Sequence, residues 1–222
     1  MDRPRVAVII PAFNEEKTIQ SVIRSLNKYS VEVIVVDDNS SDSTNVLATN
    51  EQAKVVRHFD NCGYEKAIET GFETAIAIDC QYAITFDADG QHDSDLIPKF
   101  MEAFSQGFDL VLAVRDKFPR FSEYFFSYFS KFFYGINDPL SGMKGYSLRL
   151  YHAYGAFDKY QSSGTELAIF SVLELDVSFK EFGFYVRNRN DKSRYGESIQ
   201  ANWKILFGLF KVIKSLGVNV KK

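Results

Sequence analysis

Two aspartates, Asp87 and Asp89, are separated by one residue and directly follow the short apolar run at 82–86. Side chains of an extended segment repeat with a period of two, so we expect both carboxylates on the same side of the chain. Two like charges this close repel each other, which favours a bound cation. Carboxylates and the nearby Gln91 amide suit a hard divalent ion such as Mg²⁺ or Mn²⁺. The residues predict such a metal site, with a solvated Asx turn at a strand end as the alternative.

Polar and charged residues follow two further apolar runs in the same way. Asp37 and Asp38 come directly after the run at 31–36, and Arg115 follows the run at 109–114. In open α/β sheets the ligand site lies at the carboxyl ends of the strands. We therefore expect these three strand ends to converge at one edge of the sheet.

The elements that would place these side chains alternate regularly along the first half of the chain. Apolar runs predict strands over 6–10, 31–36, 54–58, 82–86 and 109–114. Helical spacing predicts helices between them, near 19–26, up to about residue 51, over 65–79 and over 94–105. Alternating strands and helices indicate an α/β, Rossmann-like, mainly parallel sheet flanked by helices, with right-handed crossovers.

The second half of the chain has a different character. The segment 118–134 carries too many aromatic residues for one buried helix face. A strand leading into a short helix is predicted over 143–150, a helix over 165–175 and a partly alternating strand over 177–189. The chain closes with an amphipathic helix at 199–216, edged by lysines, which either packs on its own domain or lies on an anionic membrane surface.

Composition limits the class of protein. The 222 residues are 45% hydrophobic and 25% charged, which fits a globular protein with one large domain. A net charge of −3 gives no support to a nucleic-acid partner. Cys62 and Cys80 have neither metal-site spacing nor a disulfide framework. The first apolar run is too brief for a signal peptide and no run is long enough to span a membrane, so we expect a cytoplasmic protein whose membrane contact is peripheral, on the cytoplasmic face.

The motifs that indicate a family are residues 9–15, 35–40 and 87–93, together with Arg115. Together they resemble the family 2 glycosyltransferases of GT-A fold, and more narrowly the dolichyl-phosphate and polyprenyl-phosphate mannosyl- and glucosyltransferases. The resemblance extends to the basic loop at 194–198. It implies one GT-A domain over 1–222, in which 1–116 bind the nucleotide sugar and 117–222 face the acceptor and the membrane.

The resemblance also implies roles for individual residues. The nucleotide-sugar pocket would be lined by Pro11, Phe13, Glu15, Asp37, Asp38 and Asp87. The metal, Mg²⁺ or Mn²⁺, and the donor diphosphate would be held by Asp87, Asp89 and Gln91. The acceptor phosphate would be bound by Arg115, Arg120 and Arg194, and the catalytic set would be Asp89, Arg115 and Arg194. His92 is given no catalytic role.

The implied reaction follows from charge. The metal neutralises the departing diphosphate, and guanidinium groups grip an acceptor phosphate through paired hydrogen bonds. This predicts an inverting transfer of a hexose, mannose or glucose, from a GDP- or UDP-sugar to polyprenyl or dolichyl phosphate. The alternative acceptor is a hydroxyl of a surface polysaccharide or lipid-linked oligosaccharide, which would need Asp138 or Glu166 as a general base. A third hypothesis is a nucleotide-sugar-binding protein without turnover.

The sequence departs from the family pattern at two places that matter for the site. The usual Gly-Lys-Gly stretch is replaced by residues 63–66, and the lysine that commonly follows Gly-Glu-Ser is Ile199. Loss of that lysine removes one cation from the predicted lipid-phosphate site, for which Lys192 could compensate.

Overall fold

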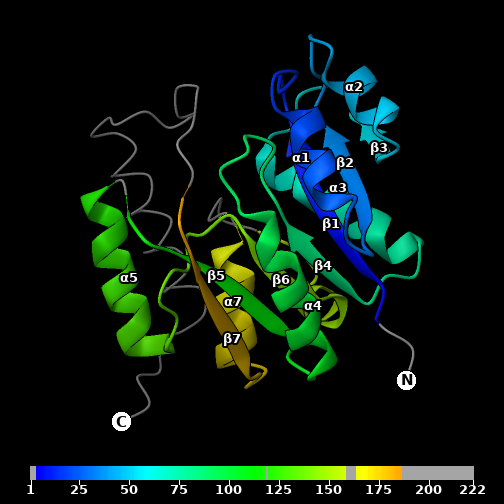
Figure 1. The fold of residues 1–222 in the computed structure, drawn as a ribbon. Coiled ribbons are helices and arrows are strands. Elements are labelled where there is room, and N and C mark those ends of the chain that lie inside the picture. The colour runs from blue at the N-terminus through cyan, green and yellow to red at the C-terminus, as the bar shows by residue number, and fades with distance from the viewer. Residues whose placement is uncertain (1–3, 119, 159–163, 187–222) are drawn as a thin grey trace.

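The computed structural model describes residues 4–118, 120–158 and 164–186, which form a mixed sheet with helices on both faces (Figure 1). The strands are β1 (Val6–Ala12), β2 (Glu32–Asp37), β3 (Lys54–Arg57), β4 (Tyr82–Thr85), β5 (Leu110–Arg115), β6 (Lys144–Ser147) and β7 (Phe179–Phe184). The helices are α1 (Ile19–Leu26), α2 (Thr44–Asn50), α3 (Tyr64–Ala77), α4 (Ile97–Ser105), α5 (Phe121–Tyr134), α6 (Leu148–Tyr154) and α7 (Thr165–Leu173), with a 3₁₀ turn at Ser94–Leu96 before α4.

The strand order across the sheet is β3-β2-β1-β4-β6-β5-β7. Strands β1 to β4 pair in parallel, as do β5 and β7, whereas β6 is antiparallel to both of its neighbours. The prediction of a mainly parallel α/β sheet is confirmed. Since β6 reverses direction between β4 and β5, those two strands still run the same way, and their carboxyl ends lie at the same edge.

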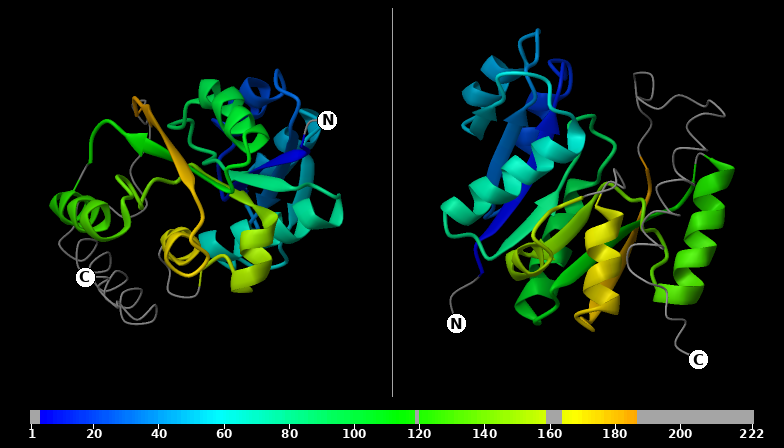
Figure 2. Two further views of the ribbon diagram at one scale, coloured as in Figure 1. Left: turned by 90° about the horizontal axis from the view of Figure 1, so that it is seen from below. Right: turned by 180° about the vertical axis from the view of Figure 1, so that it is seen from behind.

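Alternation along the strands sends apolar side chains to both faces of the sheet, as expected for a sheet covered on both sides. Val8 and Ile10 of β1 belong to the apolar cluster that includes the buried faces of α1 and α4, whereas Ala7 and Ile9 belong to the cluster that includes α3, α6 and α7. Figure 2 shows these helices as two layers around the sheet. A Cβ at Gly71 of α3 would lie 2.2 Å from Ile9 Cγ2, so glycine at this position lets α3 pack closely against β1.

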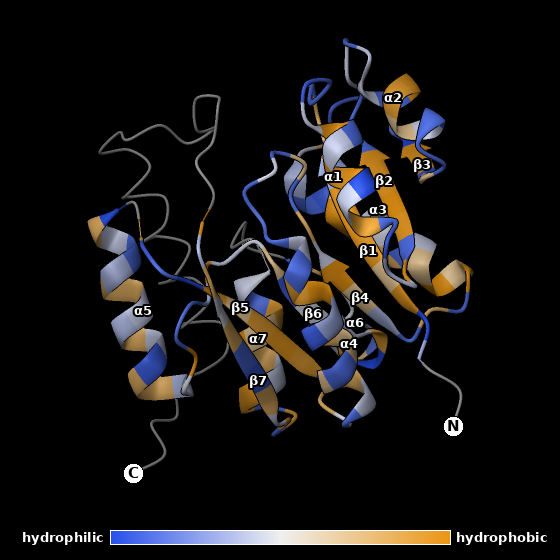
Figure 3. Cartoon of the chain, viewed as in Figure 1, coloured by the Kyte–Doolittle hydropathy of each residue, from blue (hydrophilic) through white to orange (hydrophobic). Residues whose placement is uncertain are grey.

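Helix α5 explains the excess of aromatic residues between 118 and 134. It buries Phe126 but leaves Phe121, Tyr128 and Phe132 exposed at 85%, 73% and 74%. These three, with the half-exposed Phe125, recur every three or four residues and therefore form one stripe along the helix. The helix stands at one side of the molecule, and hydrophobic residues recur along its length (Figure 1, Figure 3).

The other predicted elements differ from the structure mainly at their ends. Among the described residues, the strand predicted over 177–189 corresponds to β7, which covers Phe179–Phe184 and pairs there with β5, while residues 187–189 lie outside the description. The amphipathic helix predicted at 199–216 lies outside the described residues. In the described part of the chain, no helix combines the length and the apolar character needed to cross a bilayer.

Candidate active site

The ends of β1, β2 and β4 bring the predicted donor-side residues to one edge of the sheet. Pairing continues past the strands, since the Asp38 amide donates to the Ala12 carbonyl at 2.9 Å and the Phe86 amide donates to the Ile9 carbonyl at 2.9 Å. Pro11 is buried in β1. The polar residues that follow each strand are therefore held in place by the hydrogen-bonded strand ends.

The loop after β1 is fixed on the turn after β2. The Asn14 amide donates to Ser40 Oγ at 3.0 Å, and the Glu15 amide donates to Thr44 Oγ1 at 2.8 Å. Asn14 adopts a positive φ of 56°, a conformation that asparagine tolerates better than most residues. These bonds hold Glu15 at the edge and leave the Phe13 ring 39% exposed beside it.

Asp37 and Asp38 are both buried but have different partners. Asp37 Oδ1 accepts from the Ser40 amide at 2.9 Å, and its Oδ2 lies 3.4 Å from Arg57 Nε. Asp37 thus closes the turn that carries Ser40. This structural role explains its burial and is compatible with a position behind the pocket.

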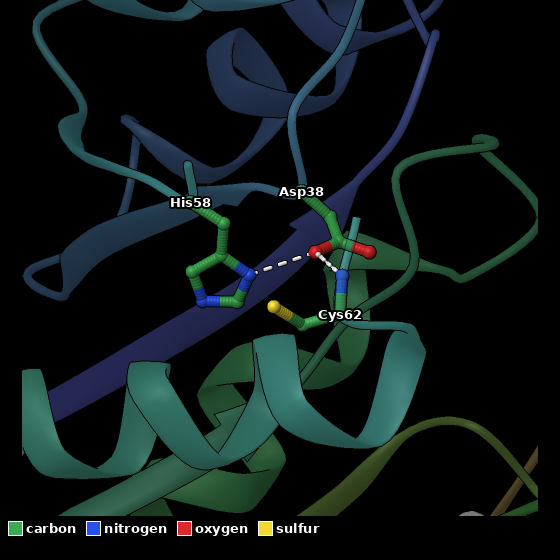
Figure 4. Close-up of side chains that lie close together, drawn as sticks. All are labelled: Asp38, His58 and Cys62. Carbon is green, nitrogen blue, oxygen red and sulfur yellow. Dashed lines mark hydrogen bonds and ion pairs between the residues drawn. The ribbon is translucent and has the colours of Figure 1, made fainter. Parts of the chain in front are cut away.

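Asp38 organises the loop that leads from β3 to α3. Its Oδ1 accepts from the Cys62 amide at 2.8 Å and lies 2.7 Å from His58 Nδ1, while its Oδ2 accepts from the Gly63 amide at 2.8 Å. Figure 4 shows the carboxylate, the imidazole and the thiol facing one another. Gly63, at φ 92°, is the N-cap of α3 in a conformation that disfavours side chains, so glycine allows the chain to turn into the helix here.

Asp87 is held by two side chains. The Tyr64 hydroxyl donates to Asp87 Oδ1 at 3.0 Å, and His92 Nε2 lies 3.4 Å from Asp87 Oδ2. The Asp87 amide donates to His92 Nδ1 at 2.9 Å, so that nitrogen carries no proton and Nε2 is the protonated one, directed at the carboxylate. A Cβ at Gly142 would lie 2.6 Å from Asp87 Oδ2, which requires a glycine at that position for this packing.

Asp89 and Gln91 continue the turn after β4. Asp89 Oδ1 accepts from the Gln91 amide at 3.0 Å, and Gly90 between them has φ 76°. Asp87, Asp89 and Gln91 are each partly exposed. Two carboxylates and one amide give a donor set of hard oxygens, which fits Mg²⁺ or Mn²⁺.

Arg115, at the end of β5, lies in a buried cluster of opposite charges. Its Nε and Nη2 donate to the two oxygens of Asp138 at 2.8 and 2.9 Å, and its Nη1 lies 2.9 Å from Glu123 Oε2. Arg120 Nη1 contacts Glu123 Oε1 at 2.7 Å. The side chains of Arg115, Glu123 and Asp138 are only 17%, 3% and 1% exposed. Burial opposes the charge of the guanidinium, but hydrogen bonding and charge from Asp138, with Glu123, outweigh it and raise the pKa of Arg115.

Lys144 of β6 lies between the two groups of carboxylates. The lysine is completely buried, and its ammonium donates to the Ser141 carbonyl at 2.5 Å. Burial lowers the pKa of Lys144 to about 8, although the charges of Asp138 and Asp87 act in the opposite direction.

The predicted site residues thus fall into two groups. The donor-side residues lie at the ends of β1, β2 and β4, whereas Arg115 and Arg120 lie together near α5. Arg194 lies outside the described residues. The prediction did not anticipate the contacts that Tyr64 and His92 make with Asp87, nor those of Glu123 with both arginines.

The chain is similar to a known protein family. Residues 7–138 match the model described as Glycosyl transferase family 2. The dolichol-phosphate mannosyltransferase of Pyrococcus furiosus is 32% identical over 119 residues, which cover 50% of this chain and 33% of that protein. The UDP-N-acetylglucosamine–dolichyl-phosphate N-acetylglucosaminyltransferase of Methanococcus voltae is 32% identical over 134 residues, covering 52% of this chain and 53% of that protein. The chain spans about half, or less, of the length of the curated relatives it matches.

Solved structures share the fold over nearly the whole chain. Glucosyl-3-phosphoglycerate synthase from Mycobacterium tuberculosis, in complex with Mn²⁺, UDP and glucosyl-3-phosphoglycerate, has a TM-score of 0.73 at 22% identity. The match covers 94% of this chain and 80% of that one. The same enzyme in complex with Mg²⁺ and UDP has a TM-score of 0.70 at 21% identity.

Proposed function

Because this chain belongs to glycosyl transferase family 2 and has the GT-A fold, we propose that it transfers a hexose from a nucleotide sugar to a polyprenyl or dolichyl phosphate. The observation that carries the proposal is the edge formed by β1, β2 and β4. There Asp38 and Asp87 are held by the Gly63 amide and the Tyr64 hydroxyl, which orient the carboxylates without neutralising them.

Asp87, Asp89 and Gln91 would hold Mg²⁺ or Mn²⁺ at this edge. Support comes from their hard-oxygen donor set and from the Mn²⁺ or Mg²⁺ bound with UDP in glucosyl-3-phosphoglycerate synthase. When bound, the ion supplies Lewis-acid neutralisation of the departing diphosphate. Tyr64 and His92 contact the Asp87 carboxylate and would fix its orientation in this site.

The nucleotide would lie over the ends of β1 and β2. Pro11, Phe13 and Glu15 would form one wall of this pocket and Asp38 the other, with the fully buried Asp37 behind it. The exposed Phe13 ring offers an apolar face for the base or ribose, and the loop contacts of Glu15 fix its position. GDP- and UDP-sugars are both candidate donors.

The acceptor phosphate would bind on the β5 side, with inversion at the sugar carbon. Arg115 and Arg120 would contribute there only by exchanging a carboxylate for the phosphate, because both are paired with acids among the described residues. Such an exchange keeps a guanidinium bound to an anion throughout. Arg194 would complete the proposed set.

The same cluster disfavours the alternative in which a sugar hydroxyl is the acceptor. That reaction needs a general base, and Asp138 accepts hydrogen bonds from three nitrogens of Arg115 while it is almost completely buried. Glu166, the other candidate base, is buried in the first turn of α7. A lipid phosphate is already anionic and does not need such a base.

The aromatic stripe of α5, defined by Phe121, Phe125, Tyr128 and Phe132, is the proposed contact with a membrane surface. A row of exposed aromatic rings buries well in the headgroup region of a bilayer. A lipid-linked acceptor would then reach the enzyme from the side on which α5 lies.

The test is nucleotide diphosphate release from a panel of GDP- and UDP-hexoses, with a short-chain polyprenyl phosphate and Mg²⁺ or Mn²⁺. We expect release that depends on the lipid phosphate and falls about 10²-fold or more in Asp89→Asn, since several kcal/mol of charge neutralisation are lost. Asp95→Asn is the matched control, because Asp95 lies in the following turn and pairs with Lys28 at the surface.

Two outcomes would contradict the proposal. Release that depends on a sugar hydroxyl and not on lipid phosphate would identify the alternative acceptor. Donor binding with no release for any acceptor would indicate a binding protein without turnover.

A further inference from the structure

Three side chains with different ligand chemistry meet at the loop between β3 and α3. Asp38 follows β2, His58 follows β3 and Cys62 precedes α3, and their ligand atoms all lie within 4.8 Å of one another. Asp38 is buried, the His58 side chain is 11% exposed and Cys62 is at the surface. The group is therefore fixed on its inner side and open on its outer side.

We propose that Asp38, His58 and Cys62 form a second cation site, selective for a thiophilic divalent ion such as Zn²⁺. One oxygen, one nitrogen and one sulfur ligand form a set that Zn²⁺ accepts in four-coordinate geometry, with water in the fourth position. The hard-oxygen set at 87–91 suits Mg²⁺ or Mn²⁺ instead. The proposal does not rest on the glycosyltransferase function.

The surroundings of His58 suit a metal ligand. His58 Nε2 lies 2.9 Å from Thr70 Oγ1, on the first half of α3. A hydroxyl can either donate to this nitrogen or accept from it, so it supports both neutral forms of the imidazole. Without an ion, Nδ1 carries the proton and donates to Asp38; with an ion, the proton sits on Nε2 and is donated to Thr70. A hydrogen bond from the second ring nitrogen is what metal-bound histidines usually make.

Asp38 is already oriented by the backbone. The amides of Cys62 and Gly63 donate to its two oxygens at 2.8 Å each, which fixes the plane of the carboxylate and leaves acceptor capacity for an ion. Tetrahedral Zn²⁺, with bonds of about 2.0–2.3 Å, separates its ligands by roughly 3.5 Å. Binding would therefore widen the 2.7 Å contact between Asp38 and His58 and draw the surface thiol inward.

The charges balance on binding. The Cys62 thiol loses its proton to solvent and binds as a thiolate, while His58 only moves its proton from Nδ1 to Nε2. Two negative ligands then neutralise the divalent ion. Cys62 Sγ contacts only the Asp60 carbonyl, at 3.3 Å, among the hydrogen bonds of this loop, a weak interaction that the ion can replace.

The test is titration of the purified, reduced full chain with Co²⁺, followed by displacement with Zn²⁺. A thiolate bound to Co²⁺ gives a ligand-to-metal charge-transfer absorption that oxygen ligands do not give. We expect one such site per chain, abolished in Cys62→Ser and retained in Cys80→Ser, in which the other, buried cysteine is replaced. Thr70→Ala should keep the absorption and weaken affinity by about tenfold or more.

Asp89→Asn separates this site from the proposed metal site at residues 87–91. It should keep the charge-transfer absorption unchanged even if it abolishes transfer. The proposal is wrong if no such absorption develops, if it survives in Cys62→Ser, or if Cys80→Ser removes it. Circular dichroism of each variant tests whether a loss of the charge-transfer absorption comes from unfolding.

Discussion

At the ends of β2 and β4, Asp38 accepts hydrogen bonds from two amides and a histidine ring, and Asp87 accepts one from a hydroxyl and lies beside a second histidine ring. Near α5, in contrast, the acids Glu123 and Asp138 bind two arginines. The contacts of Asp38 and Asp87 orient the two carboxylates but do not cancel their negative charge, so the charge can attract a cation. The ion pairs near α5 cancel charge inside the protein. The edge at β2 and β4 therefore has the charge arrangement that the proposed ligand site needs, while the paired charges near α5 have first of all a structural role.

We expect the largest loss of stability from a change in the buried charge cluster near α5. Asp138→Asn should lower the free energy of unfolding by about 3–5 kcal/mol, because it removes one partner of a buried ion pair and leaves the Arg115 guanidinium short of its carboxylate. Urea unfolding monitored by circular dichroism measures the change.

Asp87→Asn is the matched change on the donor edge, and we expect it to alter stability much less. Equal losses of unfolding free energy in Asp138→Asn and Asp87→Asn would contradict the difference between the two regions. The stability loss also means that lower activity of Asp138→Asn does not by itself identify a general base.

The buried Lys144 should make the free energy of unfolding depend on pH. Its pKa is about 8 in the folded protein against an ordinary value of 10.5, so below pH 8 the native state bears the cost of a buried charge, about 3 kcal/mol at most. As pH rises from 8 to 10.5, the native protein loses this proton before the unfolded chain does, and the cost disappears.

Lys144→Met should therefore be more stable than the unmodified protein at pH 7, with an advantage that shrinks toward pH 10. Urea unfolding of both proteins across this range measures the difference. An advantage that stays constant with pH would show that burial of charge is not its cause.

The contact between Tyr64 and Asp87 predicts a smaller effect, on activity alone. Tyr64→Phe removes the hydroxyl that orients Asp87 Oδ1, and we expect turnover to fall by about tenfold, the equivalent of one hydrogen bond, with little change in stability. Steady-state kinetics at saturating and limiting Mn²⁺ separates a loss of metal affinity from a loss of turnover. Tyr185→Phe, at an exposed tyrosine of the β5 side, should change neither.

The smallest effect on stability is expected on the outer surface of α5. Phe132→Ser should change the free energy of unfolding by no more than about 0.5 kcal/mol, because the ring is 74% exposed. Phe126→Ser, on the buried side of the same helix, should cost about 3 kcal/mol or more. Sedimentation with phosphatidylglycerol vesicles should show weaker binding for Phe132→Ser; unchanged binding would contradict the proposed membrane contact of the stripe.

The sequence was sufficient for the parts of the fold that depend on local pattern. Apolar runs and helical spacing located β1 to β5 and α1 to α4, and the acid pairs at the ends of β2 and β4 indicated the edge at which we propose the ligand site. The position of β6 between β4 and β5 was not predictable, since nothing in residues 144–147 specifies which strands they join.

Several partners of the site residues could also not be predicted from the local sequence. Tyr64 and Asp87 are 23 positions apart, and so are Arg115 and Asp138, so only the folded sheet brings each pair together. Other partners lie close in the sequence, such as Ser40 three residues after Asp37 and Glu123 three residues after Arg120.

The place of β6 has a consequence for how the protein is made. In the described sheet, β5 pairs only with β6 and β7, both of which are synthesised after it. A nascent chain that has reached residue 116 can join β1 to β4 into a sheet, but the apolar strand Leu110–Arg115 then has no neighbour and two open edges. Until β6 has left the ribosome, this strand can associate wrongly with other chains through both of its edges, and a fragment cut at residue 116 would keep that exposure permanently.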